Sequence, residues 1–130
     1  MSIDKKIRTT SLYQMHLDAG AKMVPFAGYE MPVSYPLGIK KEHIHTREKA
    51  GLFDVSHMGQ LSIEGKEALE LALEKIIPID IKNIKLNQSK YSFLTNEKGG
   101  IYDDLIVTKL TKGFNIILNA ACKKNDFKII

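Results

Sequence analysis

The sequence predicts an α+β fold, in which an antiparallel β-sheet is packed against helices. The main observation is a run of three predicted strands, 90–95, 101–110 and 114–118, joined by short turns. The first turn, 96–100, has five residues and two glycines, which is typical of a β-hairpin. Helical patterns lie before and after this run, and helices beside an antiparallel meander favour the α+β class.

The first part of the chain is expected to begin with a short helix. Thr10 or Ser11 can cap it, and it should end near Ala19, because a glycine follows. Residues 22–26 are predicted to form a strand. Glycine and proline interrupt residues 26–32, which we therefore expect to be an irregular loop.

The remaining elements are predicted from their apolar patterns and from the glycines that end them. They are helices over 36–50 and 66–76 and strands over 52–55 and 59–64. Residues 120–130 resemble the start of a helix, with Asn119 as its N-cap. This last segment ends in apolar side chains without a visible partner, which hints that the sequence is part of a longer chain.

Composition narrows the function classes. A length of 130 residues fits one domain or a piece of a larger one, and 44% hydrophobic with 26% charged residues is typical of a globular protein. The formal charge of +4 is expected to reflect a lysine-rich, solvated surface, and a weak attraction for anionic ligands is the alternative. Aromatic residues do not interleave with the basic ones, and no predicted helix has a basic face, so we do not expect nucleic-acid binding.

The sequence also gives expectations about location. No apolar run approaches the roughly 20 residues of a membrane helix. The N-terminus has charge but no apolar segment behind it, unlike a secretory signal. The single cysteine, Cys122, cannot form an internal disulfide, which agrees with a reducing compartment. We expect a cytoplasmic protein that does not enter a membrane.

Two adjacent acids are the most informative polar residues. Asp103 and Asp104 lie in a predicted strand, so their side chains should point to opposite faces and should not act together on one atom. Asp103 shares its face with Ile101, Leu105 and Val107. An acid on an apolar face is costly unless it is paired or binds something. Asp103 is therefore either a hydrogen-bond acceptor for a nearby turn or a functional acid.

Other reactive residues form no recognisable site. His43 and His45 are two residues apart on a predicted helix and face different directions, so we expect no metal site. A neighbouring pair, Ser56 and His57, does not define a catalytic triad without spatial geometry. Cys122 lies near a predicted helix N-terminus, where thiol pKa values fall, and an unreactive buried cysteine is the alternative.

Four segments, in this order and spacing, resemble the glycine cleavage system T-protein family. They are 20–32 (GAKMVPFAGYEMP), 51–59 (GLFDVSHMG), 91–107, which contains GGIYDDLIV, and 119–122 (NAAC). The first two are specific to that family, whereas the third is shared with other folate-dependent proteins, such as sarcosine and dimethylglycine dehydrogenases. The resemblance extends from about Thr10 to Phe127.

The resemblance implies the folate-binding aminomethyltransferase fold, with residues 1–130 as the N-terminal part of the folate-binding region. Full-length members are much longer. The implied enzyme transfers the methylene of an aminomethyl group, carried by the lipoylated H-protein, to tetrahydrofolate and releases ammonia. Tetrahydrofolate is the implied cofactor and methylene acceptor, and the H-protein is the implied partner.

The resemblance also implies roles for individual residues. The family's key acid is the first of the aspartate pair, which is Asp103 here. This agrees with the position of Asp103 on the apolar face of its predicted strand. The implied folate contacts are Met58, Tyr91 and Asn119, with Leu61 and Val107 as further candidates. Core filling is the alternative role for Met58 and Tyr91, and helix capping for Asn119. Asp54 and His57 are expected to hold their loop together.

Two other functions stay open. One is a non-catalytic folate-binding or interaction fragment of the same family, which would show a large exposed apolar patch. The other is a folate-binding relative that acts in repair or assembly. The segment 21–32 argues against this alternative, because it is specific to the T-protein family.

Overall fold

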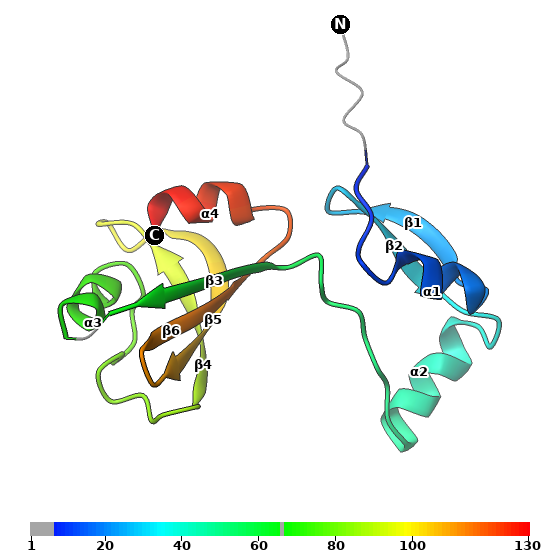
Figure 1. Cartoon of the computed structure of the whole chain (residues 1–130), viewed down its shortest axis with the longest axis horizontal. Helices are drawn as coiled ribbons and strands as arrows, with labels where there is room; N and C mark the ends of the chain where they lie inside the picture. The colour runs from blue at the N-terminus through cyan, green and yellow to red at the C-terminus, as the bar shows by residue number, and fades with distance from the viewer. Residues whose placement is uncertain (1–6, 66) are drawn as a thin grey trace, which may run out of the picture. The chain divides into compact units, whose positions relative to one another are not determined.

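A computed structural model describes residues 7–65 and 67–130. They form two compact units, one that ends at His57 and one that begins at Met58. Figure 1 shows the elements of each unit, and each is described by itself. Within the described residues, no helix is long and apolar enough to span a bilayer.

The first unit combines two helices with a β-hairpin. Its elements are α1 (Tyr13–Asp18), β1 (Lys22–Phe26), β2 (Tyr29–Ser34) and α2 (Ile39–Glu48). The strands pair antiparallel from Phe26 opposite Tyr29 outward. Ala27 and Gly28, between them, both have positive φ, of 49° and 81°, which fits a tight hairpin turn.

Two expectations for this unit are wrong. The predicted irregular loop over 26–32 is largely strand β2, which accommodates Pro32 because both strands of a two-stranded sheet are edge strands. The predicted strand over 52–55 is absent, since these residues pair with no other strand in the described chain. Leu52 is 101% exposed and Phe53 is 68% exposed, so neither side chain is buried in the first unit.

The second unit confirms the predicted antiparallel meander. Its strands are β3 (Gly59–Glu64), β4 (Ser89–Thr95), β5 (Ile101–Leu110) and β6 (Gly113–Leu118), and its helices are α3 (Glu67–Glu74) and α4 (Lys123–Ile129). The sheet order is β3-β6-β5-β4, with every neighbouring pair antiparallel. Figure 1 shows the sheet together with α3 and α4.

One face of this sheet builds the core, because alternate residues of each strand point to the same side. Val107 of β5 and Leu61 of β3 both lie opposite Ile116 of β6 in their strand pairs. The buried core residues come from α3, the segment after it and the strands: Leu73, Ile77, Ile81, Ile84, Leu94, Leu105, Val107, Phe114, Ile116 and Leu118. Burial of this apolar surface is the main stabilising contribution to the unit.

The N-cap of α4 differs from the prediction. Cys122, not Asn119, occupies the cap position, and it makes no side-chain cap hydrogen bond. The carbonyl of Asn119 accepts a hydrogen bond from the Lys123 N–H at 2.9 Å. The Asn119 side chain is turned instead toward the aspartate pair of β5, which is why it is not available as a cap.

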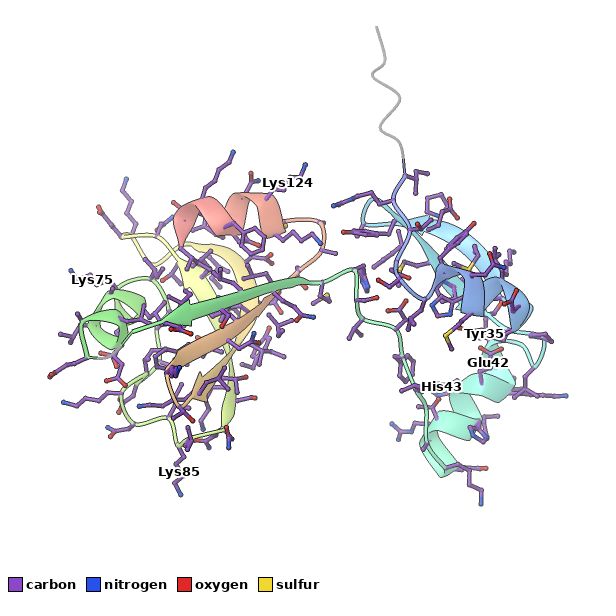
Figure 2. All side chains as sticks on the ribbon, in the orientation of Figure 1. Tyr35, Glu42, His43, Lys75, Lys85 and Lys124 are labelled. Atoms are coloured by element: carbon purple, nitrogen blue, oxygen red, sulfur yellow. The ribbon has the colours of Figure 1, made fainter. Side chains whose placement is uncertain are left out.

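The lysines agree with a solvated basic surface. Lys75, Lys85 and Lys124 are exposed and extend away from the ribbon of the second unit (Figure 2).

Candidate functional site

The sheet divides the candidate site residues between its two faces. Asp103, Leu61 and Val107 follow the alternation of the core face. Tyr91 lies opposite Ile106 on the other face, which Asp104 shares. Met58 and Asn119 stand one residue beyond the paired ends of β3 and β6, where Gly59 lies opposite Leu118, and so they extend this second face.

A small cavity lies on this second face. Its volume is about 80 Å³, and it is lined by Met58, Tyr91, Asp104, Leu105, Ile106, Ile117 and Asn119. Three of the candidate folate contacts therefore meet at one place. Leu61, Val107 and Asp103 are not among the lining residues, so Asp104 is the carboxylate at the cavity. Ligand pockets usually measure about 300–1,000 Å³, so these residues form only part of one.

Asn119 connects the two aspartates. Its Nδ2 donates to Asp103 Oδ1 at 3.0 Å and to Asp104 Oδ1 at 2.5 Å. The two carboxylates therefore share one amide donor, although they lie on opposite faces of β5 as expected. The reason is that Asn119 follows the end of β6 and lies beside Asp104, where one amide group reaches both carboxylates.

Asp103 is stabilised as a carboxylate. Burial alone raises its pKa, but hydrogen bonds from Asn119 Nδ2, the Asp104 N–H and the side chains of Cys122 and Asp126 outweigh it and hold the pKa below the usual value. The Asp104 N–H donates to Asp103 Oδ1 at 2.9 Å. Asp103 thus fulfils the expectation that an acid on this face must be paired.

Tyr91 completes the polar side of the cavity. A side-chain hydrogen bond to Asp104, together with desolvation and the charges of Asp104 and Asp103, raises the pKa of its phenol. The hydroxyl therefore stays protonated and donates to the carboxylate. The ring packs edge to face on Phe93, with centroids 5.5 Å apart.

The Cys122 thiol and the Asp126 carboxyl group, which both interact with Asp103, differ from what the sequence suggested. Burial and the neighbouring charge of Asp103 raise the pKa of the Cys122 thiol, so the suggested fall does not occur. Asp126 of α4 is only 2% exposed, and burial and the charge of Asp103 raise its pKa to about 6. Sequence reasoning missed Asp126, although an acid among apolar residues near the chain end was a usable signal.

The first unit has a separate polar network around Asp54. Its Oδ2 accepts from the Thr10 hydroxyl at 2.8 Å and lies 2.9 Å from His16 Nε2, while its Oδ1 accepts from the Ser56 N–H at 2.9 Å and from the Ser56 hydroxyl. The Tyr35 hydroxyl lies 2.7 Å from His16 Nδ1. This pattern agrees with the expectation that Asp54 holds its loop in place.

A cavity of about 420 Å³ lies beside this network in the first unit, and Tyr35, Glu42 and Asp54 contribute to its lining. Figure 2 shows Tyr35 close to Glu42, whose Oε1 accepts from the Tyr35 N–H at 2.8 Å. His57 packs its ring against Phe26 and Tyr29, with centroids 5.8 and 6.2 Å apart. Among the described residues, no group of three potential metal ligands comes together.

Comparisons of the chain with protein families, with individual proteins and with solved structures all point to one family. Residues 12–130 match the family described as the GCVT N-terminal domain. The chain is 46% identical to the mitochondrial aminomethyltransferase of Dictyostelium discoideum over 99% of its length, and 43% identical to the aminomethyltransferase of Shouchella clausii over 98%. It covers 32% and 35% of those two proteins, and therefore spans about a third of their length.

A solved structure agrees with this. The crystal structure of glycine cleavage system aminomethyltransferase T from Bartonella henselae matches with a TM-score of 0.87 and 48% identity, over 94% of this chain and 34% of that one. The comparison confirms the predicted α+β fold and the resemblance noted in the sequence. The chain belongs to the GCVT N-terminal domain family.

Proposed function

We propose that the chain takes part in tetrahydrofolate-dependent aminomethyl transfer, as the N-terminal part of a folate-binding region. The observation that carries the proposal is the hydrogen-bonded series Tyr91, Asp104, Asn119 and Asp103. The first three of these residues line an apolar cavity with Met58 in its wall, and Asp103 is joined to them through Asn119. The names of the relatives, aminomethyltransferases, supply the reaction.

The residues present suit one edge of a folate ring system. Tetrahydrofolate would supply the ring nitrogens that accept the methylene group. Met58, Ile106 and Ile117 offer apolar surface for a flat ring, and the Asp104 carboxylate offers an acceptor for its N–H groups. The small cavity volume agrees with a site whose other wall lies outside this chain.

Within this site, we assign the acid role to Asp103. An ionised carboxylate beside the ring nitrogens can accept a hydrogen bond or a proton while a nitrogen becomes a better nucleophile. Asn119 would hold the carboxylates of Asp103 and Asp104 close together, so that the positions of the two groups are set before the substrate binds. Leu61 and Val107 stay candidate contacts and lie on the core face of the sheet.

The proposal includes a partner and a location. The aminomethyl donor would be the lipoylated H-protein of the glycine cleavage system, and the proposed compartment is the cytoplasm. The matched relatives include bacterial proteins and mitochondrial ones.

The experiment is an ammonia-release assay with aminomethylated H-protein and tetrahydrofolate. We expect Asp103→Asn to lower the rate by about 100-fold or more, in the range of lost acid–base catalysis. Asp104→Asn, which keeps an acceptor at the cavity, is the matched comparison. Equal rates for the wild-type chain and Asp103→Asn would contradict the assignment of Asp103.

A second candidate is a folate-binding or interaction fragment without turnover. The observation in its favour is the exposed apolar segment with Leu52, Phe53 and Val55, which are 101%, 68% and 60% exposed. A chain that binds tetrahydrofolate but releases no ammonia under the same conditions would favour this candidate.

A further inference from the structure

The larger cavity of the molecule lies in the first unit, and the proposed folate site does not use it. Its volume is about 420 Å³, and all of its lining residues fall between Met31 and Asp54. The cavity of the proposed folate site is lined by residues of the second unit instead. Small-molecule sites usually measure about 300–1,000 Å³, so the cavity of the first unit is large enough to hold a ligand by itself.

Most of the wall of this cavity is apolar. Met31 of β2 contributes to it, together with Leu37, Leu52 and Phe53. The last three side chains are 53%, 101% and 68% exposed, so a ligand in the cavity would remove apolar surface from water. Because such burial favours binding, the ligand should carry an apolar ring or a short apolar chain.

Glu42 gives the cavity a carboxylate oxygen that is available to a ligand. Its Oε1 accepts a hydrogen bond from the Tyr35 N–H at 2.8 Å, and Figure 2 shows the two residues beside each other. Its Oε2 accepts no hydrogen bond from the described residues. A carboxylate only accepts hydrogen bonds, so a ligand bound at Oε2 must bring a donor.

The charges at the wall favour a cationic donor. Asp54 also lines the cavity, and its side chain is 2% exposed. Burial, followed by the negative charges of Asp54 and Glu42, raises the pKa of the Tyr35 phenol, so both charges act on the same part of the wall. Among the described residues that line the cavity, none is a lysine or an arginine, and only His45 can become cationic. An ammonium group would be attracted by both carboxylates.

Asp54 supplies charge to the cavity but no direct contact. Its Oδ2 accepts from the Thr10 hydroxyl at 2.8 Å and lies 2.9 Å from His16 Nε2. Its Oδ1 accepts from the N–H and the hydroxyl of Ser56. These hydrogen bonds occupy both oxygens and hold the carboxylate in place, so Glu42 is left as the group that touches the ligand.

We propose that this cavity binds a small primary amine as its ammonium ion, with an apolar ring or short chain attached. The ammonium group donates to Glu42 Oε2 near the charge of Asp54, and the apolar part covers Leu37 and Phe53. The proposal concerns binding and includes no bond-forming step. It does not depend on the proposed folate site, because the two cavities have no lining residue in common.

The test is a titration of the full 130-residue chain with phenylmethylamine at pH 8, followed by amide NMR shifts. At this pH histidine side chains are ordinarily neutral and do not repel a cation. We expect the largest shifts at amides between residues 31 and 54 and a Kd of about 1 mM, which is usual for so small a ligand. Phenylmethanol, in which a hydroxyl replaces the ammonium group, should bind more weakly by about tenfold or more.

Two variants separate the polar contact from the apolar one. Glu42→Gln keeps an oxygen for the Tyr35 N–H but turns the second position into a donor, so the affinity for phenylmethylamine should fall by about tenfold or more. Glu48→Gln makes the same change of charge at an exposed position of α2 that does not line the cavity, and it should leave the affinity unchanged. Phe53→Ala should weaken binding by about 3- to 10-fold, the effect of roughly 30–60 Å² of lost apolar contact.

Three results would each overturn the proposal. They are no shift of the amides between residues 31 and 54 at about 10 mM phenylmethylamine, equal affinity for phenylmethylamine and phenylmethanol, and unchanged affinity in Glu42→Gln. The amide shifts of β1 and β2 report whether Glu42→Gln keeps its fold. If it does not, phenylmethanol and Phe53→Ala, an exposed position, still decide the question.

Discussion

Removal of the Asp54 carboxylate should destabilise the first unit selectively. The Asp54 side chain is 2% exposed and accepts hydrogen bonds from three residues, Thr10, His16 and Ser56. A hydrogen bond to a charged acceptor contributes about 1.5–3 kcal/mol. If the bonds from Thr10 and His16 alone are counted, Asp54→Ala should cost about 3–6 kcal/mol. Total stabilities are about 5–15 kcal/mol, so this is a large fraction.

Native-state hydrogen exchange is the suitable assay, because it reports the opening free energy of each amide separately. Amides of β1 and β2 should lose about 3–6 kcal/mol of protection in Asp54→Ala. Amides of β5 and β6, in the other unit, should be unchanged. Asp18→Ala is the control and should change protection by less than about 0.5 kcal/mol, as expected for an exposed surface residue.

The same variant gives a pH test with a definite sign. Burial raises the pKa of Asp54, but the hydrogen bonds from His16, Ser56 and Thr10 outweigh it and lower the pKa well below the usual 3.8. The stabilisation is therefore fully present above pH 3.8 and is lost as the pH falls. The difference between wild type and Asp54→Ala should shrink in acid. A protection loss below about 1 kcal/mol at pH 7 would refute the reasoning, because it is less than one such bond contributes.

Three further predictions concern the second unit, and all can be measured by urea denaturation at equilibrium. Gly113→Ala should cost about 2–4 kcal/mol, because an added Cβ would lie 2.0 Å from the carbonyl oxygen of Ile63; a change below 1 kcal/mol would contradict the close approach. Phe114→Ala should cost about 3–5 kcal/mol, since the ring is 2% exposed in the core; a small effect would mean that the core collapses around the gap. Asp126 has a pKa raised from 3.8 to about 6, so its contribution to stability should fall by about 3 kcal/mol between pH 4 and pH 6 and stay constant above. Asp126→Asn should remove this slope, and a variant with the same slope would contradict it.

The sequence predicted the meander because its signals are local. Alternating apolar residues and glycine-containing turns determine β4, β5 and β6 without knowledge of distant contacts. Strand β2 was missed because Pro32 and Gly28 weigh against a strand, whereas an isolated hairpin tolerates both. The segment 52–55 has strand-forming residues but no partner strand in the structure.

The candidate site was predicted only in part, for a physical reason. Alternation along β5 separates Asp103 from Asp104 correctly, and the register of the sheet brings Met58, Tyr91 and Asn119 to the face of Asp104. The bridge from Asn119 to both acids depends on side-chain reach just beyond a strand end, which periodicity does not encode. The pairing of Asp103 with Asp126 depends on how α4 packs on the sheet.

The most direct measurement is a calorimetric titration of tetrahydrofolate into the wild-type chain and into Asp103→Asn. The account predicts binding to the wild type that is weaker by about tenfold or more in the variant, the effect of one lost charged hydrogen bond. Equal affinity of the two proteins, or the absence of binding to either, would contradict the claim that this aspartate forms part of a folate site.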